Sequence, residues 1–186
     1  MIARCEWASR NDLMAEYHDT EWGVPSHDDI HLFEMLVLEG SQAGLSWQTI
    51  LNKREGYRAA FANFDLATIS TYGKSDVERL AQDARIVRHQ GKIEATIDNA
   101  ITSLVVQAEF GSLDTYLWGL AGGQSIKNSP ETISDVQATT EVSISMSKAL
   151  KNRGFRFVGP TTVYAFMQST GMVNDHVITC FRYNEV

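Results

Sequence analysis

Apolar residues recur at helical spacing along most of the chain. The clearest run lies in residues 92–111, where the apolar positions of one predicted face are Ile93, Ile97, Ile101, Leu104, Val105 and Ala108. Side chains about four residues apart lie on the same side of an α-helix, so this run predicts a long helix that buries these residues and ends at Gly111. No alternating run is long enough to predict a sheet, although residues 141–145 could form a short extended segment. The pattern predicts an all-α fold.

Capping residues mark where several helices begin. Ser75 and Glu78 have the spacing of a capping box, in which each side chain bonds a free N–H group at the start of a helix. Ser26 and Asp29 form a weaker version of this signal, and Asp65 is placed to cap the helix that follows it. We therefore expect helices to start after Ser26, Asp65 and Ser75.

The length and composition of the chain favour one folded unit. Its 186 residues, of which 44% are hydrophobic, are enough to bury a substantial core. There is no internal repeat, and residues 119–138, which contain several glycines and serines, predict the longest loop. We expect a single domain over residues 1–186.

The cysteines and the apolar pattern indicate where the protein works. Cys5 and Cys180 are the two cysteines, so no disulfide framework is predicted and a reducing compartment fits, although one bridge between them is possible. No stretch approaches the roughly 18 apolar residues of a membrane span, and the first residues lack the apolar run of a signal peptide. We expect a cytoplasmic monomer with no membrane partner.

The charge of the chain is acidic overall but basic in one region. A net charge of −7 argues against non-specific coating of nucleic acid, because phosphate binding depends on positive charge. Between residues 143 and 173, however, the charged side chains are Lys148, Lys151, Arg153 and Arg156, with no acid among them. This run is either a binding surface for an anion or an ordinary solvated helix face.

The same region predicts two helices joined by a glycine turn, over residues 147–170. The first ends in basic residues and Gly154, and Pro160 suits the first turn of the second. The N–H groups that start the second helix would face a phosphate, so the candidate DNA-binding residues are Lys151, Arg153, Arg156, Gly159, Thr161 and Thr162. The turn resembles a helix-hairpin-helix element, with Arg156 where that motif has proline and Phe157 where it has its first glycine. The alternative is a plain connection between packed helices.

The two ends of the chain carry a possible set of metal ligands. Cys5 and His18 lie near the N-terminus, and the segment HVITC places His176 and Cys180 four residues apart, on one face if it is helical. Two thiolates and two imidazoles suit a tetrahedral, structural zinc with no open position. From spacing alone, ordinary buried cysteines and unconnected histidines remain an alternative. His27, His31 and His89 lie in polar surroundings that we expect to be exposed.

The segment LEGSQAGLSW, residues 38–47, places a carboxylate at the end of an apolar run and a tryptophan shortly after it. Glu39 could be a helix-end carboxylate that accepts loop N–H groups, and Trp47 a plain core aromatic. Alternatively, the pair could line a pocket for a flat, polar base, which needs an aromatic face and hydrogen bonds to its edge. Trp22 and Trp118 we expect in the core.

Taken together, these segments resemble the bacterial 3-methyladenine DNA glycosylases of the constitutive, type I class. The matching segments are RCEW (4–7), YHDTEWGVP (17–25), LFEMLVLEGSQAGLSW (32–47), KREGYR (53–58), RHQGKI (88–93), SKALKNRGFRFVG (147–159) and VNDHVITC (173–180). The resemblance implies a helix-hairpin-helix DNA glycosylase fold with a second helical subdomain. In that subdomain one structural zinc would join the N- and C-terminal segments through Cys5, His18, His176 and Cys180.

The resemblance also implies a base pocket. Glu39 would read the edge of the extruded base and act as the catalytic carboxylate, and Trp47 would stack on the ring. Tyr17 would supply a hydroxyl, and Trp7 would complete the aromatic wall. Met14 stands where some relatives carry a tyrosine, so this wall could be looser here.

The activity implied is hydrolytic excision of 3-methyladenine from alkylated double-stranded DNA, which leaves an abasic site and free 3-methyladenine. The superfamily's catalytic aspartate is replaced by Asn174, with Asp175 one residue along, and no lysine occupies the bifunctional position near the hairpin. We therefore expect no strand-cutting lyase activity. Two rival functions are a non-catalytic DNA-binding module and a zinc hydrolase with an open metal position.

Overall fold

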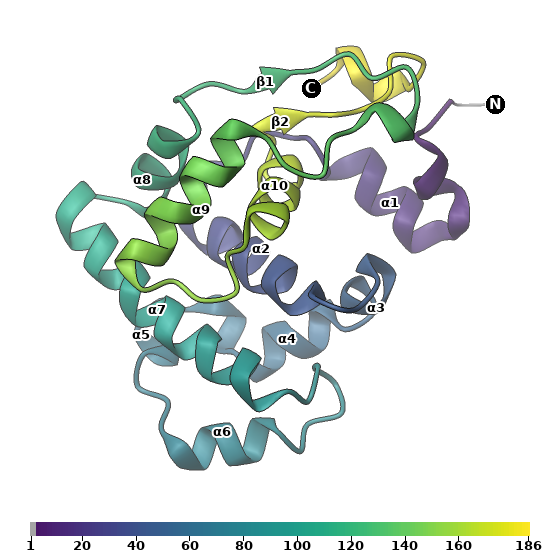
Figure 1. Cartoon of the computed structure of the whole chain (residues 1–186). Helices are drawn as coiled ribbons and strands as arrows, with labels where there is room; N and C mark the ends of the chain where they lie inside the picture. The colour runs from purple at the N-terminus through teal and green to yellow at the C-terminus, as the bar shows by residue number, and fades with distance from the viewer. Residues whose placement is uncertain (1–2) are drawn as a thin grey trace.

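The structure, a computed structural model, describes residues 3–186 and is predominantly helical (Figure 1). The α-helices are α1 (Asp12–Thr20), α2 (Asp29–Gln42), α3 (Trp47–Leu51), α4 (Arg54–Ala60), α5 (Leu66–Ile69), α6 (Lys74–Leu80), α7 (Gln90–Phe110), α8 (Leu113–Leu120), α9 (Glu141–Arg153) and α10 (Pro160–Ser169). Short 3₁₀ helices are η1 (Glu6–Arg10), η2 (Ala62–Phe64), η3 (Ile133–Asp135) and η4 (Phe181–Asn184). The predicted all-α architecture is confirmed apart from two very short strands.

The two strands are β1 (Ile126–Lys127) and β2 (Val173–Asn174), which pair in parallel. Ile126 lies opposite Val173, and Lys127 opposite Asn174. The pairing ties the long loop after α8 to the segment after α10, so the predicted loop at residues 119–138 is fastened at its middle rather than free.

Helix starts agree with the sequence at one of the three positions. Asp65 accepts a hydrogen bond from the Thr68 N–H group and caps α5 as predicted. The prediction for Ser26 is wrong, because the extended residue directly before α2 is Asp28, whose carboxylate takes the cap. The prediction for Ser75 is also wrong: α6 starts two residues earlier, after Gly73. A cap depends on which residue has extended backbone just before the first turn, and spacing alone leaves that open by one or two residues.

The segment at residues 141–145 is helical, which excludes the short extended alternative. It forms the first turns of α9, and Thr140 and Ser143 exchange side-chain hydrogen bonds with each other's N–H groups there. This capping box satisfies N–H groups that a helix start otherwise leaves free, and it outweighs the strand preference of the β-branched residues that follow.

Helix α7 exists as predicted, but its buried face differs. Ile93 and Ile97 are buried, whereas Ile101 is 46% exposed and Val105 is 57% exposed. The small or β-branched residues that take their place in the core are Ala100, Ser103 and Val106. A strict four-residue repeat turns about 40° further around the helix at each step, because one turn takes 3.6 residues. The later isoleucine and valine have therefore rotated out to solvent.

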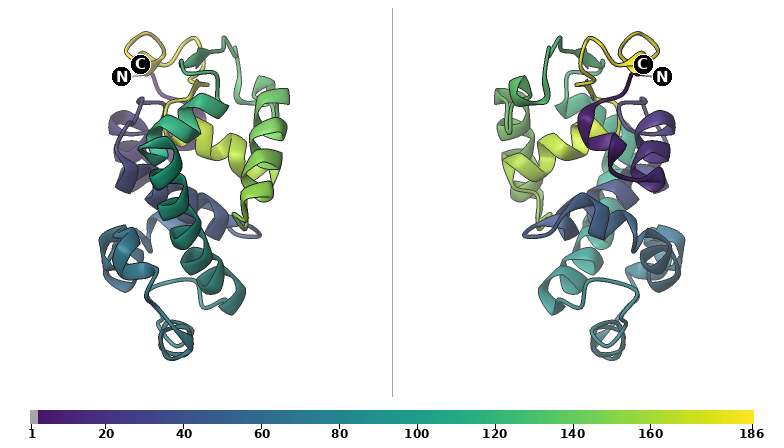
Figure 2. Two further views of the ribbon diagram at one scale, coloured as in Figure 1. Left: turned by 90° about the vertical axis from the view of Figure 1, so that its left-hand side faces the viewer. Right: turned by 90° about the vertical axis from the view of Figure 1, so that its right-hand side faces the viewer.

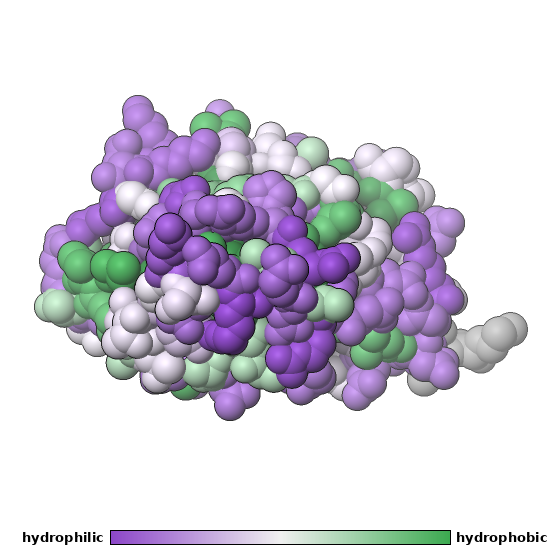
Figure 3. Space-filling view, turned by 90° about the horizontal axis from the view of Figure 1, so that it is seen from below, coloured by the Kyte–Doolittle hydropathy of each residue, from purple (hydrophilic) through white to green (hydrophobic). Residues whose placement is uncertain are grey.

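The chain folds so that its two ends meet. The Phe181 N–H group donates to the Ala3 carbonyl at 2.9 Å, and both ends of the chain lie at the end of the molecule opposite α6 (Figure 1 and Figure 2). Helix α10 packs against both α2 and α9 near the centre, while α7 packs against α5, α6 and α8 (Figure 1). Seen from the α6 end, the surface is mostly hydrophilic, with hydrophobic residues scattered over it (Figure 3). Among residues 3–186 no helix is both long and apolar enough to cross a membrane.

Candidate functional site

A cavity of about 480 Å³ opens between α1, α2, α10 and the loop that contains η3. The residues that line it are Trp7, Arg10, Met14, Tyr17, Trp22, Glu39, Gln42, Ser46, Trp47, Ile133, Val136, Ala165 and Gln168. All four residues expected to bind a base, Trp7, Tyr17, Glu39 and Trp47, are among them. The cavity therefore brings together side chains from the first 50 residues and from the C-terminal third of the chain.

Glu39 is a buried carboxylate on the wall of this cavity. It lies in the last turns of α2, is 5% exposed, and makes no ion pair among the residues that the structure describes. Burial raises its pKa to about 8, with a small opposing effect from the hydroxyl of Ser169. In the protein alone the side chain is thus mainly neutral at pH 7, and a cationic ligand would favour its ionised form.

Two polar atoms near Glu39 are buried without a hydrogen-bond partner in the described part of the chain. They are the Tyr17 hydroxyl and the indole Nε1 of Trp47. The two rings lie 5.2 Å apart between centroids. Burial, and then the nearby charge of Glu39, raises the pKa of Tyr17, so its hydroxyl stays protonated and can donate. Buried polar groups are normally paired, so these atoms indicate that a polar ligand completes the site.

Aromatic side chains form the rest of the wall. Trp7 and Trp22 meet edge to face with centroids 5.1 Å apart, and Trp7 also contacts the Tyr17 ring at 6.3 Å. Trp22 is 8% exposed, as expected for a core residue, but it also lines the cavity, which the sequence did not indicate. Met14 is buried and lines the cavity as well, so it forms part of this wall.

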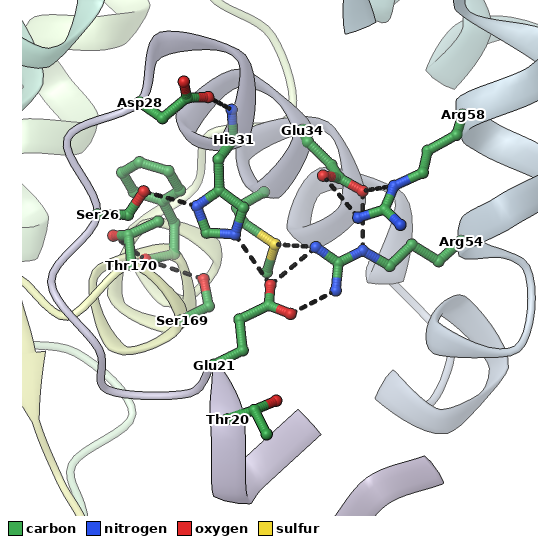
Figure 4. A network of polar contacts seen from close by, with 12 residues as sticks. Thr20, Glu21, Ser26, Asp28, His31, Glu34, Arg54, Arg58, Ser169 and Thr170 are labelled. Carbon is green, nitrogen blue, oxygen red and sulfur yellow. Dashed lines mark hydrogen bonds and ion pairs between the residues drawn. The ribbon is translucent and has the colours of Figure 1, made fainter. Parts of the chain in front are cut away.

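A network of ion pairs fixes the helices that carry these side chains (Figure 4). Arg54 on α4 donates to Glu21, directly after α1, at 2.6 and 2.8 Å, and to Glu34 on α2 at 2.8 Å. Arg58 also donates to Glu34, at 2.8 Å. His31 contacts Glu21 at 2.9 Å and is half-buried, so the expectation that it is exposed is wrong. The network joins the residue after α1 to α2 and α4, and α1 and α2 are the helices that carry Tyr17 and Glu39.

The four candidate metal ligands converge at the end of the molecule where the termini meet. The ligand atoms of Cys5, His18, His176 and Cys180 all lie within 4.8 Å of one another, and all four residues are buried. The Cys180 sulfur is 3.4 Å from His18 Nε2 and 3.5 Å from His176 Nδ1. Both cysteines are free, so the possible bridge between them is not formed. These residues could hold one metal ion.

The C-terminal pair reaches this cluster by a turn and not by a helix. His176 and Cys180 lie in irregular backbone, where the Cys180 N–H group donates to the Val177 carbonyl at 2.8 Å. The condition for a shared helix face, a helical segment, is therefore not met, although the two residues do converge. A turn brings positions i and i+4 together as a helix does, so spacing alone does not distinguish the two.

The second nitrogen of each histidine is held by a neighbour. His18 Nδ1 lies 2.8 Å from a carboxylate oxygen of Asp19, which in turn accepts from Arg4. His176 Nε2 donates to the Trp22 carbonyl at 3.0 Å. Burial lowers the pKa of His176 to about 4 and raises the pKa of the Cys5 thiol to about 12. The imidazoles are therefore neutral and oriented, which is the form that ligates metals, whereas the thiols need a cation to ionise.

The predicted hairpin forms between α9 and α10. Gly154 ends α9 in the left-handed conformation, Gly159 precedes α10, and Pro160 is its first residue. Phe157 has φ of 56°, a left-handed value that glycine would adopt more readily, at the position where the helix-hairpin-helix motif has its first glycine. The Asn99 side chain bonds both backbone groups of Arg156, at 2.7 and 3.1 Å, and holds the turn on α7.

The basic residues of the hairpin differ in their surroundings. Arg153 pairs with Glu109, and Arg156 pairs with Asp98 at 2.6 Å. Lys151 is exposed and pairs with no acid in the described chain. Thr161 is exposed and Thr162 half-buried at the start of α10, where no side chain caps the helix. Two of the three predicted cations are thus already paired, in exposed pairs of the kind that contribute little to stability.

Sequence reasoning missed several residues at the site. Lys92 is 8% exposed and donates to the carbonyls of Ser41 at 2.8 Å and Ala43 at 2.7 Å, which holds the loop between α2 and α3. Gln168 lines the cavity, and its Nε2 donates to Asp175 at 2.7 Å. No local pattern marked either residue, because Lys92 lies outside the helix face that the apolar spacing predicts to be buried and Gln168 reaches its partner only through the fold.

Comparison with known proteins gives a consistent result over almost the whole chain. The family model for methyladenine glycosylase matches residues 7–183. The chain is 48% identical to DNA-3-methyladenine glycosylase 1 of Escherichia coli (strain K12), over 98% of this chain and 97% of that protein. It superposes on a crystal structure of 3-methyladenine DNA glycosylase I with a TM-score of 0.94 at 47% identity, over 96% and 98% of the two chains.

A second structure supplies a ligand complex. A variant of 3-methyladenine DNA glycosylase I in complex with 3-methyladenine superposes with a TM-score of 0.92 at 34% identity, over 96% of each chain. Sequence, fold and length agree in all of these comparisons. This chain belongs to the methyladenine glycosylase family.

Proposed function

We propose that this protein is a monofunctional DNA glycosylase that flips 3-methyladenine out of alkylated double-stranded DNA and hydrolyses its N-glycosidic bond. The observation that carries the proposal is the pairing of a buried, uncompensated Glu39 with two unpartnered donors, Tyr17 and Trp47, in one aromatic cavity. A relative of the same fold is known in complex with 3-methyladenine, which supports this choice of base.

The chemistry of the lesion fits the cavity. Methylation at N3 leaves the base cationic in the nucleotide, so ionised Glu39 would attract it while the Trp47 face adds a cation–π contribution. The base has to leave the duplex before its bond can be cut, and the Tyr17 hydroxyl would take over a hydrogen bond that the base once made to its partner or to water.

A cationic leaving group needs little acid assistance, so orientation and the charge of Glu39 are the main contributions of the protein. Asn174 donates to the carbonyls of Tyr183 and Val186 at 3.1 and 2.9 Å, which gives it a structural role where the superfamily has an aspartate. No lysine is among the cavity residues of the described chain. Water is therefore the nucleophile, and the products are free 3-methyladenine and an abasic site.

The metal that best suits the terminal cluster is a structural zinc. In tetrahedral zinc coordination a thiolate sulfur and an imidazole nitrogen stand about 3.5 Å apart, given bonds of about 2.0 to 2.3 Å. The corresponding separations here are 3.4 to 3.6 Å. Cys5 and His18 with His176 and Cys180 would join the two terminal segments into the second helical subdomain. Four protein ligands leave no open position, so the metal would supply stability and take no part in the chemistry.

The DNA surface would be the hairpin. The uncapped start of α10 offers the N–H groups of Thr161 and Thr162 to a phosphate, with Gly159 allowing close approach. Lys151 is available directly, while Arg153 and Arg156 would exchange their exposed carboxylate partners for phosphates. We assign these contacts to the phosphate backbone of the DNA. They would contribute to the affinity for DNA and not to the choice of base.

Base release from methylated duplex DNA, separated by chromatography, tests the proposal. Wild-type protein should free 3-methyladenine. Glu39→Ala should lose about a hundredfold or more in rate, and Trp47→Ala about ten- to a hundredfold through lost stacking. Glu78→Ala, on exposed α6 at the far end of the molecule, is the matched control and should match the wild type. DNA binding without base release by folded, metal-replete protein would favour a non-catalytic module instead, and a borohydride-trapped enzyme–DNA adduct would exclude the monofunctional mechanism.

A further inference from the structure

Asp175 is a buried carboxylate behind the base cavity that the proposed reaction does not use. It is 2% exposed and accepts three hydrogen bonds from uncharged groups. The Tyr164 hydroxyl donates at 2.6 Å, and the side-chain amides of Gln168 and Asn128 donate at 2.7 Å each. With Tyr164 and Asn128, the carboxylate lines a second, polar cavity of about 260 Å³. Gln168 is thus bonded to a group on the wall of one cavity while it lines the other.

The contact with Asp175 decides which end of the Gln168 amide is bonded within the protein and which end is free. A carboxylate that already receives two other hydrogen bonds is an acceptor, so the NH₂ group of Gln168 has to turn toward it. The Oε1 atom then points away from Asp175. Across the described residues no group donates to Oε1, because the Gln168 side chain takes part in the Asp175 bond alone. Because Gln168 lines the base cavity, its Oε1 atom is the end of the amide that is left free to accept from a ligand there.

We propose that Gln168 is a specificity-determining residue, whose Oε1 atom accepts from the exocyclic amino group of an adenine-type base. A guanine-type base carries a carbonyl oxygen at that ring position, which would oppose Oε1. Asp175 is the positioning residue that prevents the amide from turning over. This inference rests on the proposed glycosylase function and adds a second acceptor, beside Glu39, that discriminates between purines.

The physical basis is the asymmetry of buried hydrogen bonds. A fixed acceptor gains a modest amount from a matching donor, but it loses more when it is left facing another acceptor, because neither group is then solvated. The two ends of a glutamine amide are nearly equal in size. If Asp175 were absent, the amide could therefore rotate, and its NH₂ group could donate to the carbonyl oxygen of a guanine-type base. The hydrogen bond to Asp175 thus makes Gln168 favour a base that presents a hydrogen-bond donor.

Binding of the free bases 3-methyladenine and 3-methylguanine, followed by quenching of tryptophan fluorescence, tests this without requiring catalysis. Gln168→Met keeps the length of the side chain and removes the amide. It should raise the Kd for 3-methyladenine about tenfold. The ratio of the Kd for 3-methylguanine to the Kd for 3-methyladenine should fall by a similar factor. Asp175→Asn should narrow the preference in the same direction, provided that metal content and Tm are those of the wild type, since His176 is adjacent.

Gln107→Met is the matched control, because Gln107 makes an equivalent 2.7 Å bond to Asp29 away from the cavity. It should keep the wild-type preference. An unchanged preference in Gln168→Met, or an equal narrowing in Gln107→Met, would overturn the inference. An assay of base release from methylated duplex DNA separates the two proposals. If the wild-type protein binds the free bases selectively but releases neither from DNA, the glycosylase function is contradicted. The role of Gln168 is then judged from the binding data alone.

Discussion

The free energy of unfolding of a Glu39→Gln variant should rise relative to that of the wild type as the pH rises, so that the variant is the more stable protein at pH 8. The folded pKa of Glu39 is about 8, against 4.5 for an ordinary glutamate. Below pH 4.5 the side chain is neutral in both folded and unfolded chains and carries no penalty. Between these two values the unfolded chain ionises while the folded chain stays protonated, so the stability of the wild type falls with rising pH. Glutamine does not titrate and escapes this loss.

The size of the effect follows from the two pKa values. Linkage gives a penalty of about 1 kcal/mol at pH 5 and about 4 kcal/mol at pH 8. The amide introduced by Glu39→Gln would itself lack a partner, at a cost of about 1 to 3 kcal/mol that does not vary with pH. The difference between variant and wild type should therefore change by about 3 kcal/mol between pH 5 and pH 8, which is a change of about 10 °C in relative Tm for a chain of this size.

Thermal or urea unfolding of the Glu39→Gln variant and the wild type at pH 5 and pH 8, without DNA or base, measures this change in relative stability. Glu34→Gln is a matched control on the same helix, since Glu34 is 4% exposed but its pKa is lowered: burial opposes the shift, and the hydrogen bonds from Arg54 and Arg58 outweigh it. That variant should be destabilised by similar amounts at pH 5 and pH 8, because the wild-type carboxylate, with its lowered pKa, is ionised in the folded protein at both values. If the difference in free energy of unfolding between Glu39→Gln and the wild type is the same at both pH values, Glu39 is not a buried carboxylate without a compensating charge.

Three further predictions follow from the structure. Cys180→Ser should lower bound metal below one ion per chain and lower Tm by several degrees, measured by metal analysis and calorimetry; full metal content in the variant would contradict the four-ligand site. Lys151→Ala should weaken binding to any duplex DNA and reduce the salt dependence by about one phosphate contact, whereas Lys74→Ala on α6 should not. Lys92→Met should free the loop between α2 and α3 and slow excision from duplex DNA about tenfold, while binding of the free base stays near the wild-type value. An equal loss in both assays would assign Lys92 a general structural role.

Much of the fold was predictable because it depends on neighbours in the chain. The long α7, the cap at Asp65 and the glycine turn before Pro160 each follow from residues within about four positions of one another. The errors arose where spacing leaves two geometries open. His176 and Cys180 converge through a turn, and Ile101 rotates out of the core that the pattern assigned to it.

The sequence by itself determined the helical architecture, the hairpin and the identity of the residues that the family resemblance singles out. Only the tertiary structure decided their environments. Glu34 and Glu39 lie on the same helix and are equally buried, yet the pKa of the first is lowered and that of the second is raised to about 8. The difference comes from two arginines of α4 that the fold brings to Glu34 and not to Glu39. The effect of a positive charge on the pKa of a carboxylate depends on the distance between the two groups in space, and local sequence does not encode that distance.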